Sequence, residues 1–97
     1  MGAQTLLITP LRHNTIMLNL TLYHYNECSY CAKVRNFLKK NKISIPMKNI
    51  RENAQFREEL IKIGGKSQVP CLVIDGQALY ESVDIIRWLT EYFKRKT

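Results

Sequence analysis

The chain has 97 residues, 45% of them hydrophobic, which suits one compact domain and excludes extensive disorder. Fifteen basic residues against eight acidic ones give a net charge of +7, and this favours an anionic partner, with a merely solvated basic surface as the alternative. Three cysteines are few, and their number is odd, which does not suit a secreted domain stabilised by disulfides. We therefore expect reactive thiols in a reducing, cytoplasmic setting.

The N-terminal residues differ from the rest of the chain. Residues 1–16 show no clear hydrophobic period, and we expect them to form an extension that precedes a compact domain of residues 17–97. Their apolar piece, 6–8, has no basic residue before it, so it makes a poor signal peptide. No segment reaches the ~20 apolar residues that span a bilayer, and the scattered Lys and Arg residues lack the interleaved aromatics of a nucleic-acid site. We therefore expect neither a membrane nor a nucleic acid as partner.

The first two expected elements are a strand and a helix. The strand covers residues 18–25, because Leu18, Leu20 and Leu22 alternate with more polar residues. The helix covers residues 29–41, and three apolar residues at helical spacing form its buried face, with a fourth as a further candidate: Val34, Phe37 and Leu38, with Tyr30.

A short strand and a second helix follow. The strand covers residues 43–48, and Pro46 favours either a sheet edge or an irregular start, because it lacks the N–H of a central ladder residue. Asn53 is a good N-cap for a helix over residues 54–63, and Gly64-Gly65 should end it. The residues expected to be buried on this helix are Phe56, Leu60 and Ile61.

The last three elements are a hairpin and a helix. Residues 71–74 form a continuous apolar run typical of a buried strand, and Asp75-Gly76 favours a type I′ turn into a strand over 78–80. Ser82 is expected to cap a last helix that runs to about residue 94. The order β-α-β-α-β-β-α predicts an α/β fold, with a four-stranded mixed sheet and helices on both faces.

The chemistry is concentrated in Cys28-Ser29-Tyr30-Cys31, where the first strand meets the first helix. A cysteine at a helix start faces unpaired N–H groups and the positive end of the helix dipole, and both favour thiolate over thiol. Cys31 follows one turn later, within reach of Cys28. This pattern predicts thiol–disulfide exchange, with Cys28 as nucleophile and Cys31 as resolving thiol.

Two other interpretations of the cysteines are less favoured. A structural zinc site needs four ligands, and the residues left for it have no recognised spacing: Cys71, His24 and His13. Cys71 opens a buried strand and is expected to be a small core residue, with a peripheral oxidisable thiol as the alternative. We therefore expect no metal site apart from a cluster alternative that is described below.

Taken together, these motifs resemble the glutaredoxins of the thioredoxin-like superfamily. Cys28 to Cys31 is similar to the family's Cys-Pro-Tyr-Cys, with Ser29 in place of proline. Val69-Pro70 lies where the family has Thr-Val-Pro, whose proline is cis. Before the last helix the sequence departs from the usual glutaredoxin motif. Glu81-Ser82 there is similar to the Glu-Ser that holds the γ-glutamyl end of glutathione in the N-terminal domains of glutathione S-transferases. The resemblance covers residues 17–97.

The resemblance implies a glutathione-dependent oxidoreductase, expected to act as a monomer, that reduces glutathione mixed disulfides and protein disulfides. Glutathione would be its co-substrate, and glutathionylated or disulfide-containing proteins its partners. The implied glutathione site consists of Tyr30, Val69, Pro70, Glu81 and Ser82. The family's lysine three residues before the first cysteine is Tyr25 here, so Lys66 is the candidate for the glycyl carboxylate.

Ser29 keeps a second function open. Glutaredoxins with a residue other than proline at this place include some that bridge a [2Fe–2S] cluster between two protomers, using the first cysteine and glutathione. Cys28 would then be the ligand. A third alternative is a glutaredoxin-like protein that takes electrons from thioredoxin reductase rather than from glutathione.

Overall fold

A computed structural model describes residues 18–95 of the chain. The expected extension of residues 1–16 and the expected domain start at Met17 lie outside the described residues. The elements are β1 (Leu20–His24), α1 (Ser29–Lys40), β2 (Met47–Asn49), α2 (Ala54–Gly64), β3 (Cys71–Ile74), β4 (Gln77–Tyr80) and α3 (Ser82–Arg95). None of the described helices is long and apolar enough to cross a membrane.

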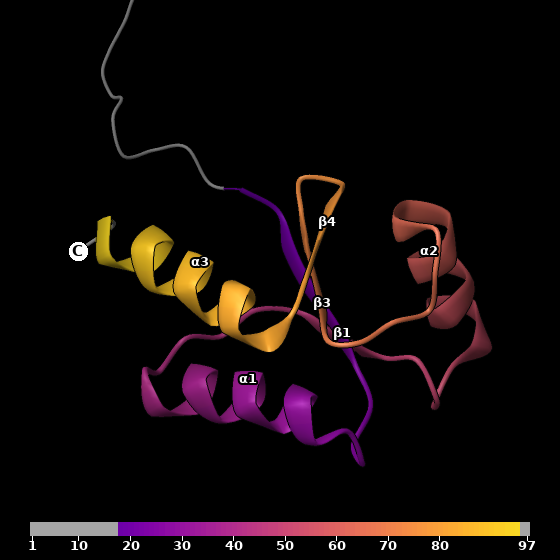
Figure 1. Cartoon of the computed structure of the whole chain (residues 1–97), viewed down its shortest axis with the longest axis horizontal. Coiled ribbons are helices and arrows are strands. Elements are labelled where there is room, and N and C mark those ends of the chain that lie inside the picture. Colours follow the sequence, from indigo (N-terminus) through magenta and orange to yellow (C-terminus); the bar gives the residue numbers. More distant parts are fainter. Residues whose placement is uncertain (1–17, 96–97) are drawn as a thin grey trace, which may run out of the picture.

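The four strands form one mixed sheet in the order β2-β1-β3-β4. β1 runs parallel to β2 and antiparallel to β3, which pairs with β4 in a hairpin. In Figure 1, α1 and α3 lie together on one side of the sheet, and α2 covers the other. The expected α/β architecture with helices on both faces is therefore confirmed.

Alternation along the strands divides the core into two layers. Leu20 and Leu22 of β1, with Leu72 of β3, face α1 and α3, where Val34 and Leu89 are fully buried. The intervening residues point the other way and pack beneath α2, together with Ile50: Tyr23, Cys71 and Val73, against Leu60. Cys71 is thus a fully buried core residue, as expected.

The Asp75-Gly76 turn has the expected geometry. Its φ angles are 47° and 84°, the two positive values that a type I′ turn requires. The Asp75 carboxylate accepts a hydrogen bond from the backbone N–H of Asn19 over 2.8 Å. The turn thereby fixes the register of β3 and β4 against β1.

The edge strand is shorter than its apolar pattern suggested. We expected residues 43–48, but β2 begins at Met47. The carbonyl of Pro46 accepts the N–H of Leu22 over 2.9 Å, whereas its own nitrogen has no proton to give. Ile43 and Ile45 pack against the core from an irregular segment instead. The edge position itself is confirmed.

Three expectations about helix faces and caps are wrong. Ile61 is 36% exposed, because Phe56 and Leu60 lie four residues apart on the covered face of α2 and Ile61 points aside. Tyr30 is 59% exposed and is not part of the buried face of α1. Ser82 is the first helical residue rather than the cap, because the carbonyl of Glu81 already accepts the N–H of Ile85 over 2.9 Å.

Candidate active site

Cys28 occupies the N-cap position of α1. Its backbone is extended, with φ −80° and ψ 117°, and its Sγ accepts a hydrogen bond from the backbone N–H of Cys31 over 3.3 Å. The sulfur takes the place of the oxygen with which a serine or aspartate usually caps a helix. This position places the sulfur against the unpaired N–H groups and the positive end of the helix dipole. Cys28 is only partly buried, so this sulfur can reach a second molecule.

Cys31 is the buried partner of Cys28. Burial raises the pKa of its thiol to about 12, and a hydrogen bond with Cys28 acts in the same direction. The Tyr25 backbone and the positive charge of Arg35 act the other way. The reduced pair therefore consists of one accessible sulfur that is suited to attack and one buried, protonated thiol that is suited to resolve a mixed disulfide.

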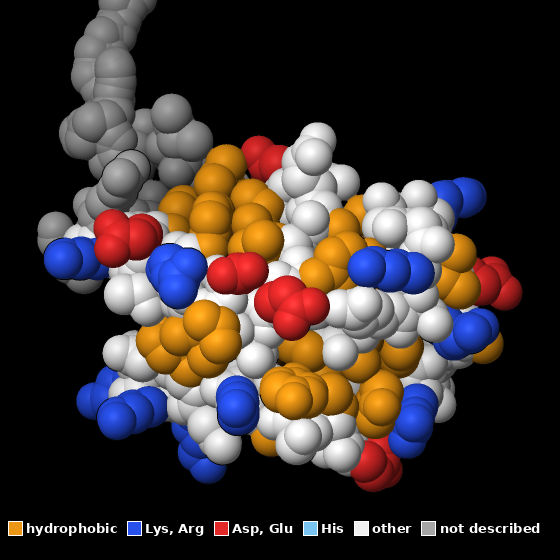
Figure 2. Space-filling model, viewed as in Figure 1, with side chains coloured by type: hydrophobic (Ala, Val, Ile, Leu, Met, Phe, Trp, Pro, Cys, Tyr) orange, Lys and Arg blue, Asp and Glu red, His pale blue; other side chains and the backbone are white. Residues whose placement is uncertain are grey.

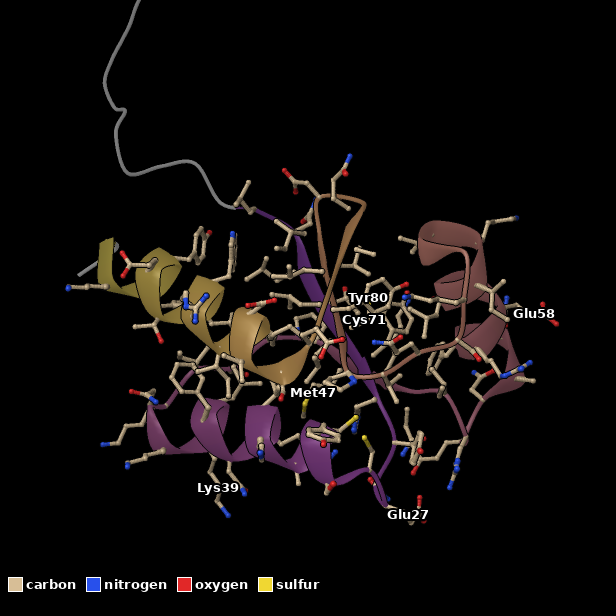
Figure 3. All side chains as sticks on the ribbon, in the orientation of Figure 1. Glu27, Lys39, Met47, Glu58, Cys71 and Tyr80 are labelled. Carbon is tan, nitrogen blue, oxygen red and sulfur yellow. The ribbon has the colours of Figure 1, made fainter. Side chains whose placement is uncertain are left out.

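The turn from β1 into α1 is held from several sides. The N–H of Cys28 donates to the carbonyl of Tyr25 over 3.3 Å, and Glu27 lies at the tip of the turn in Figure 3. Asn49, at the end of the parallel strand β2, donates to the side chain of Asn26 over 3.3 Å. Arg35 donates to the carbonyl oxygens of Tyr25 and Asn26 over 3.2 Å each. Sequence reasoning missed Arg35 and Asn49, although the i,i+4 spacing from Cys31 to Arg35 was a usable signal.

The expected Val69–Pro70 segment lies at the same end of the sheet as the cysteines. The bond between these residues is cis, as expected. Tyr23 of β1 pairs with Cys71 of β3, so Pro70 lies beside the end of β1 from which the chain turns to Cys28. The antiparallel register thus brings together two segments about 40 residues apart.

Glu81 and Ser82 join this end of the sheet through the hairpin. Tyr80 pairs with Cys71, so Glu81 follows directly beside Pro70. Glu81 is exposed and has a φ of 74°, and its carboxylate accepts a hydrogen bond from the Gln68 amide over 3.4 Å. Ser82 is only 5% exposed. Of the two expected residues, only Glu81 therefore presents its side chain freely to solvent.

Tyr30 and Lys66, the remaining expected site residues, each take part in a contact between a cation and an aromatic ring. Tyr30 is exposed beside Cys28, with Lys33 Nζ 5.3 Å from its ring centroid. Lys66 Nζ lies 4.4 Å from the ring centroid of Tyr80. The guanidinium of Arg51 lies 3.7 Å from the ring centroid of Tyr25. Sequence reasoning missed Arg51, which lies over Tyr25, the residue that stands in place of the lysine of the resembled family.

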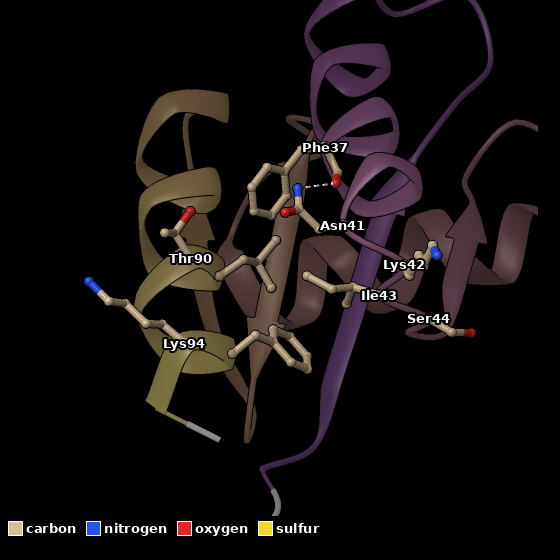
Figure 4. A pocket seen from close by; sticks show the side chains of 9 residues that line it. Phe37, Asn41, Lys42, Ile43, Ser44, Thr90 and Lys94 are labelled. Atoms are coloured by element: carbon tan, nitrogen blue, oxygen red, sulfur yellow. Dashed lines mark hydrogen bonds between the residues drawn. The ribbon is translucent and has the colours of Figure 1, made fainter. Parts of the chain in front are cut away.

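Other surface features do not add to this site. Figure 4 shows a groove between the C-terminal end of α1 and α3, lined by Phe37 and Ile43 among others, at the end of α1 remote from Cys28. In Figure 2, Lys and Arg side chains are spread over the visible face and its rim rather than gathered in one stripe. Within residues 18–95, no three His, Cys, Asp or Glu side chains gather closely enough to hold a metal ion.

Comparison with known proteins agrees with this geometry. The chain is 36% identical over 61 residues to glutaredoxin 3 of Escherichia coli strain K12. The aligned region covers 63% of this chain and 74% of that protein. It is 38% identical over 80 residues to prostaglandin E synthase 2 of Danio rerio, and the aligned region covers 81% of this chain. The chain spans only 20% of the length of that second relative.

Solved structures and a family model point the same way. Glutathione transferase Omega 3C from Trametes versicolor superposes with a TM-score of 0.69 at 25% identity, over 81% of this chain and 35% of that one. Thioredoxin-like proteins and a glutaredoxin also superpose, so the fold is the expected thioredoxin-like α/β fold. Residues 20–79, more than half of the chain, match the Glutaredoxin family model. The chain therefore belongs to the glutaredoxin family, whose chemistry is thiol–disulfide exchange.

Proposed function

We propose that this protein is a glutathione-dependent oxidoreductase that reduces glutathione mixed disulfides and protein disulfides. The observation that carries the proposal is the asymmetric cysteine pair at the start of α1, with a partly exposed Cys28 Sγ that accepts the Cys31 N–H over 3.3 Å. Such a pair can exchange disulfides in two stages, because one sulfur meets the substrate and the other is held back.

Glutathione fits the groups that surround Cys28. It is an extended tripeptide with one ammonium and two carboxylates, so it needs backbone partners in its middle and opposite charges at its ends. The backbone of Val69, before cis Pro70, would pair with its main chain. The exposed Glu81 carboxylate would receive the γ-glutamyl ammonium, next to Ser82. Lys66 or Arg51 would receive the glycyl carboxylate, and Tyr30 would pack beside the ligand.

The proposed cycle uses two exchanges. The Cys28 thiolate attacks the glutathionyl sulfur of a substrate, and the protein thiol leaves as thiolate. A second glutathione thiolate then attacks that sulfur and forms glutathione disulfide, with Cys28 as leaving group. With a protein disulfide, Cys31 instead attacks Cys28 Sγ, releases the substrate thiol and leaves a Cys28–Cys31 disulfide for glutathione to reduce.

Two alternative functions have fewer supporting observations than this one. A [2Fe–2S] cluster bridged by two protomers would use Cys28 and glutathione, and Ser29, which is exposed at the first position of α1, is the feature that suggests it. The superposed holo glutaredoxin C1 of a poplar hybrid is 18% identical, so it bears on the fold alone. Electron supply from thioredoxin reductase would leave the Glu81–Ser82 pair without a role. The monomeric state and the cytoplasmic setting stay predictions.

The test is glutathione-dependent reduction of a small mixed disulfide, coupled to NADPH and glutathione reductase. We expect the wild type to turn over, Cys28→Ser to be inactive and Cys31→Ser to keep activity. Turnover that persists without glutathione but with NADPH and thioredoxin reductase would contradict the proposal. The absorption spectrum of freshly purified protein between 300 and 600 nm tests the cluster alternative separately.

A further inference from the structure

Arg35 connects the active-site helix to the turn that carries Cys28. It lies four residues after Cys31 and therefore on the same side of α1. Its guanidinium donates to His24 Nδ1 over 3.0 Å and to the carbonyl oxygens of Tyr25 and Asn26 over 3.2 Å each. Since a guanidinium can only donate, Nδ1 of His24 accepts and carries no proton. These three acceptors are an imidazole nitrogen and two backbone carbonyls, so none of them is a carboxylate that would cancel the charge of Arg35.

These bonds fix the main chain immediately before Cys28. The carbonyl of Tyr25 accepts from both Arg35 and the N–H of Cys28, over 3.2 and 3.3 Å. His24 is buried at the end of β1, so it gives Arg35 a rigid anchor in the sheet. A planar fork can reach several acceptors at fixed angles, which a lysine ammonium on a flexible stem does not reproduce.

Arg35 also supplies a positive charge to the resolving thiol. The groups that influence the pKa of buried Cys31 are Cys28, the Tyr25 backbone and Arg35, and Arg35 is the one side-chain cation among them. Cys28 raises the pKa of Cys31 through a hydrogen bond and, when it is a thiolate, through its charge, which a mixed disulfide removes. Burial then opposes ionisation of Cys31, and Arg35 favours it.

We propose that Arg35 is a positioning residue for the step in which Cys31 displaces the thiol bound to Cys28. In this step Cys31 gives its proton to solvent, and its Sγ attacks Cys28 Sγ. The new Cys28–Cys31 bond forms as the bond from Cys28 to the departing thiol breaks, and that thiol leaves as thiolate. Arg35 keeps its proton throughout. It fixes the turn through its hydrogen bonds, and its positive charge stabilises the negative charge that develops on Cys31 Sγ.

The step can be observed without glutathione. Mixing the reduced protein with dithiodipyridine, an uncharged aromatic disulfide, releases one thiopyridone when Cys28 attacks and a second when Cys31 resolves the mixed disulfide. Stopped-flow absorbance separates the two phases, and Cys31→Ser, which lacks the second phase, identifies them. The probe has no charge for Arg35 to attract. Failure of the glutathione-dependent assay would leave this measurement unaffected, so the two proposals fail separately.

We expect Arg35→Gln to slow the second phase roughly three- to tenfold near pH 7 and to move its pH midpoint upward, with a smaller effect on the first phase. Arg35→Lys should keep the pH midpoint of the wild type while losing some rate, because it keeps the charge but not the fork. Arg57→Gln, which removes an exposed charge on α2, is the matched control and should match the wild type.

Three results would overturn the proposal. One is a second phase of Arg35→Gln with wild-type rate and midpoint. Another is an equal slowing of both phases, which indicates only a disturbed fold. The third is an Arg35→Lys variant whose midpoint shifts as far as that of Arg35→Gln, since then the charge of residue 35 has no part in the step.

Discussion

Gly64, the last residue of α2, lies directly against the hydroxyl of Tyr80 in β4. A Cβ on Gly64 would overlap that hydroxyl and would lie 3.0 Å from the adjoining ring carbon and 3.4 Å from the Cβ of Ala78. The hydroxyl is buried, with no nitrogen or oxygen partner within the described residues, and the thiol of Cys71 is the polar group beside it. Figure 3 shows Tyr80 next to Cys71, between the sheet and α2. The close approach of α2 to β4 therefore depends on the missing side chain of Gly64.

Gly64→Ala should lower the free energy of unfolding by about 1–3 kcal/mol, the usual cost of overpacking. Tyr80→Phe removes a buried hydroxyl whose polar neighbour is the weakly hydrogen-bonding thiol of Cys71, so it should be close to neutral. The double variant should recover part of the loss, because the overlapping atom is gone. Urea unfolding of all four proteins measures the coupling. Strictly additive effects would show that the contact between Gly64 and Tyr80 does not set the cost.

Glu81 has a φ of 74° although it is not glycine, and such a backbone costs about 1 kcal/mol or more. Glu81→Gly should therefore stabilise the protein by about 1 kcal/mol. It should also raise the KM for glutathione, because the carboxylate proposed to receive the γ-glutamyl ammonium is lost. Thermal unfolding and the coupled assay measure the two effects.

Lys42 offers the matched control for Glu81. It also has a positive φ, 56°, in the turn that ends α1, far along the helix from Cys28. Lys42→Gly should give a similar stabilisation with an unchanged KM for glutathione. If Glu81→Gly stabilises the protein and leaves KM unchanged as well, Glu81 has no part in binding glutathione.

The position of the cysteine pair at the start of α1 was predictable because its signals are local. A strand pattern, two cysteines two residues apart and a helix pattern determine that Cys28 caps a helix, whatever the rest of the chain does. The type I′ turn at Asp75-Gly76 is equally local, since only its two residues need positive φ angles. The placement of cis Pro70 and Glu81 beside the cysteines came instead from the resemblance to glutaredoxins.

The errors arose where tertiary contacts outweigh local preference. Ser82 has a side chain suited to capping, but the chain reaches α3 through a left-handed Glu81, whose carbonyl starts the helix. Tyr30 fits the apolar stripe of α1, yet it lies in the first turn beside Cys28 and is exposed. Arg35 and Arg51 interact with a turn of irregular backbone, and no hydrophobic period reports such contacts.

Tyr23, Lys48 and Glu59 form a charged cluster between the sheet and α2. Glu59 Oε1 accepts from Lys48 Nζ over 2.8 Å and from the Tyr23 hydroxyl over 2.9 Å. Both bonds, Lys48 first, hold the pKa of Glu59 below its usual 4.5. A lowered carboxyl pKa contributes stability that is present above the unfolded value and lost as pH falls through the folded one. Glu59→Gln should therefore flatten the dependence of unfolding on pH between about 5 and 3, and Glu58→Gln, an exposed neighbour, should not.

The same cluster makes the free energy of unfolding depend on pH at the alkaline end, through Tyr23. Burial, followed by the bond to Glu59, raises the pKa of Tyr23 from 10.0 to about 12. A raised pKa contributes stability that is complete below pH 10 and is lost as pH rises towards 12. Tyr23→Phe should remove this alkaline loss, as followed by circular dichroism in urea. An unchanged alkaline slope in Tyr23→Phe would assign the loss to other groups.

His24 should make the stability of the active-site turn depend on pH near neutrality. Burial, followed by the charge of Arg35, lowers the pKa of His24 below its usual 6.5, while Glu52 acts weakly the other way. A lowered histidine pKa contributes stability that is complete above about pH 6.5 and is lost as pH falls through the folded value. Protonation of Nδ1 would also place a proton where Arg35 donates. His24→Asn keeps an acceptor and cannot gain a charge, so its free energy of unfolding should fall less than that of the wild type between pH 7 and 5. Parallel curves for the two proteins would show that folding leaves the pKa of His24 unshifted.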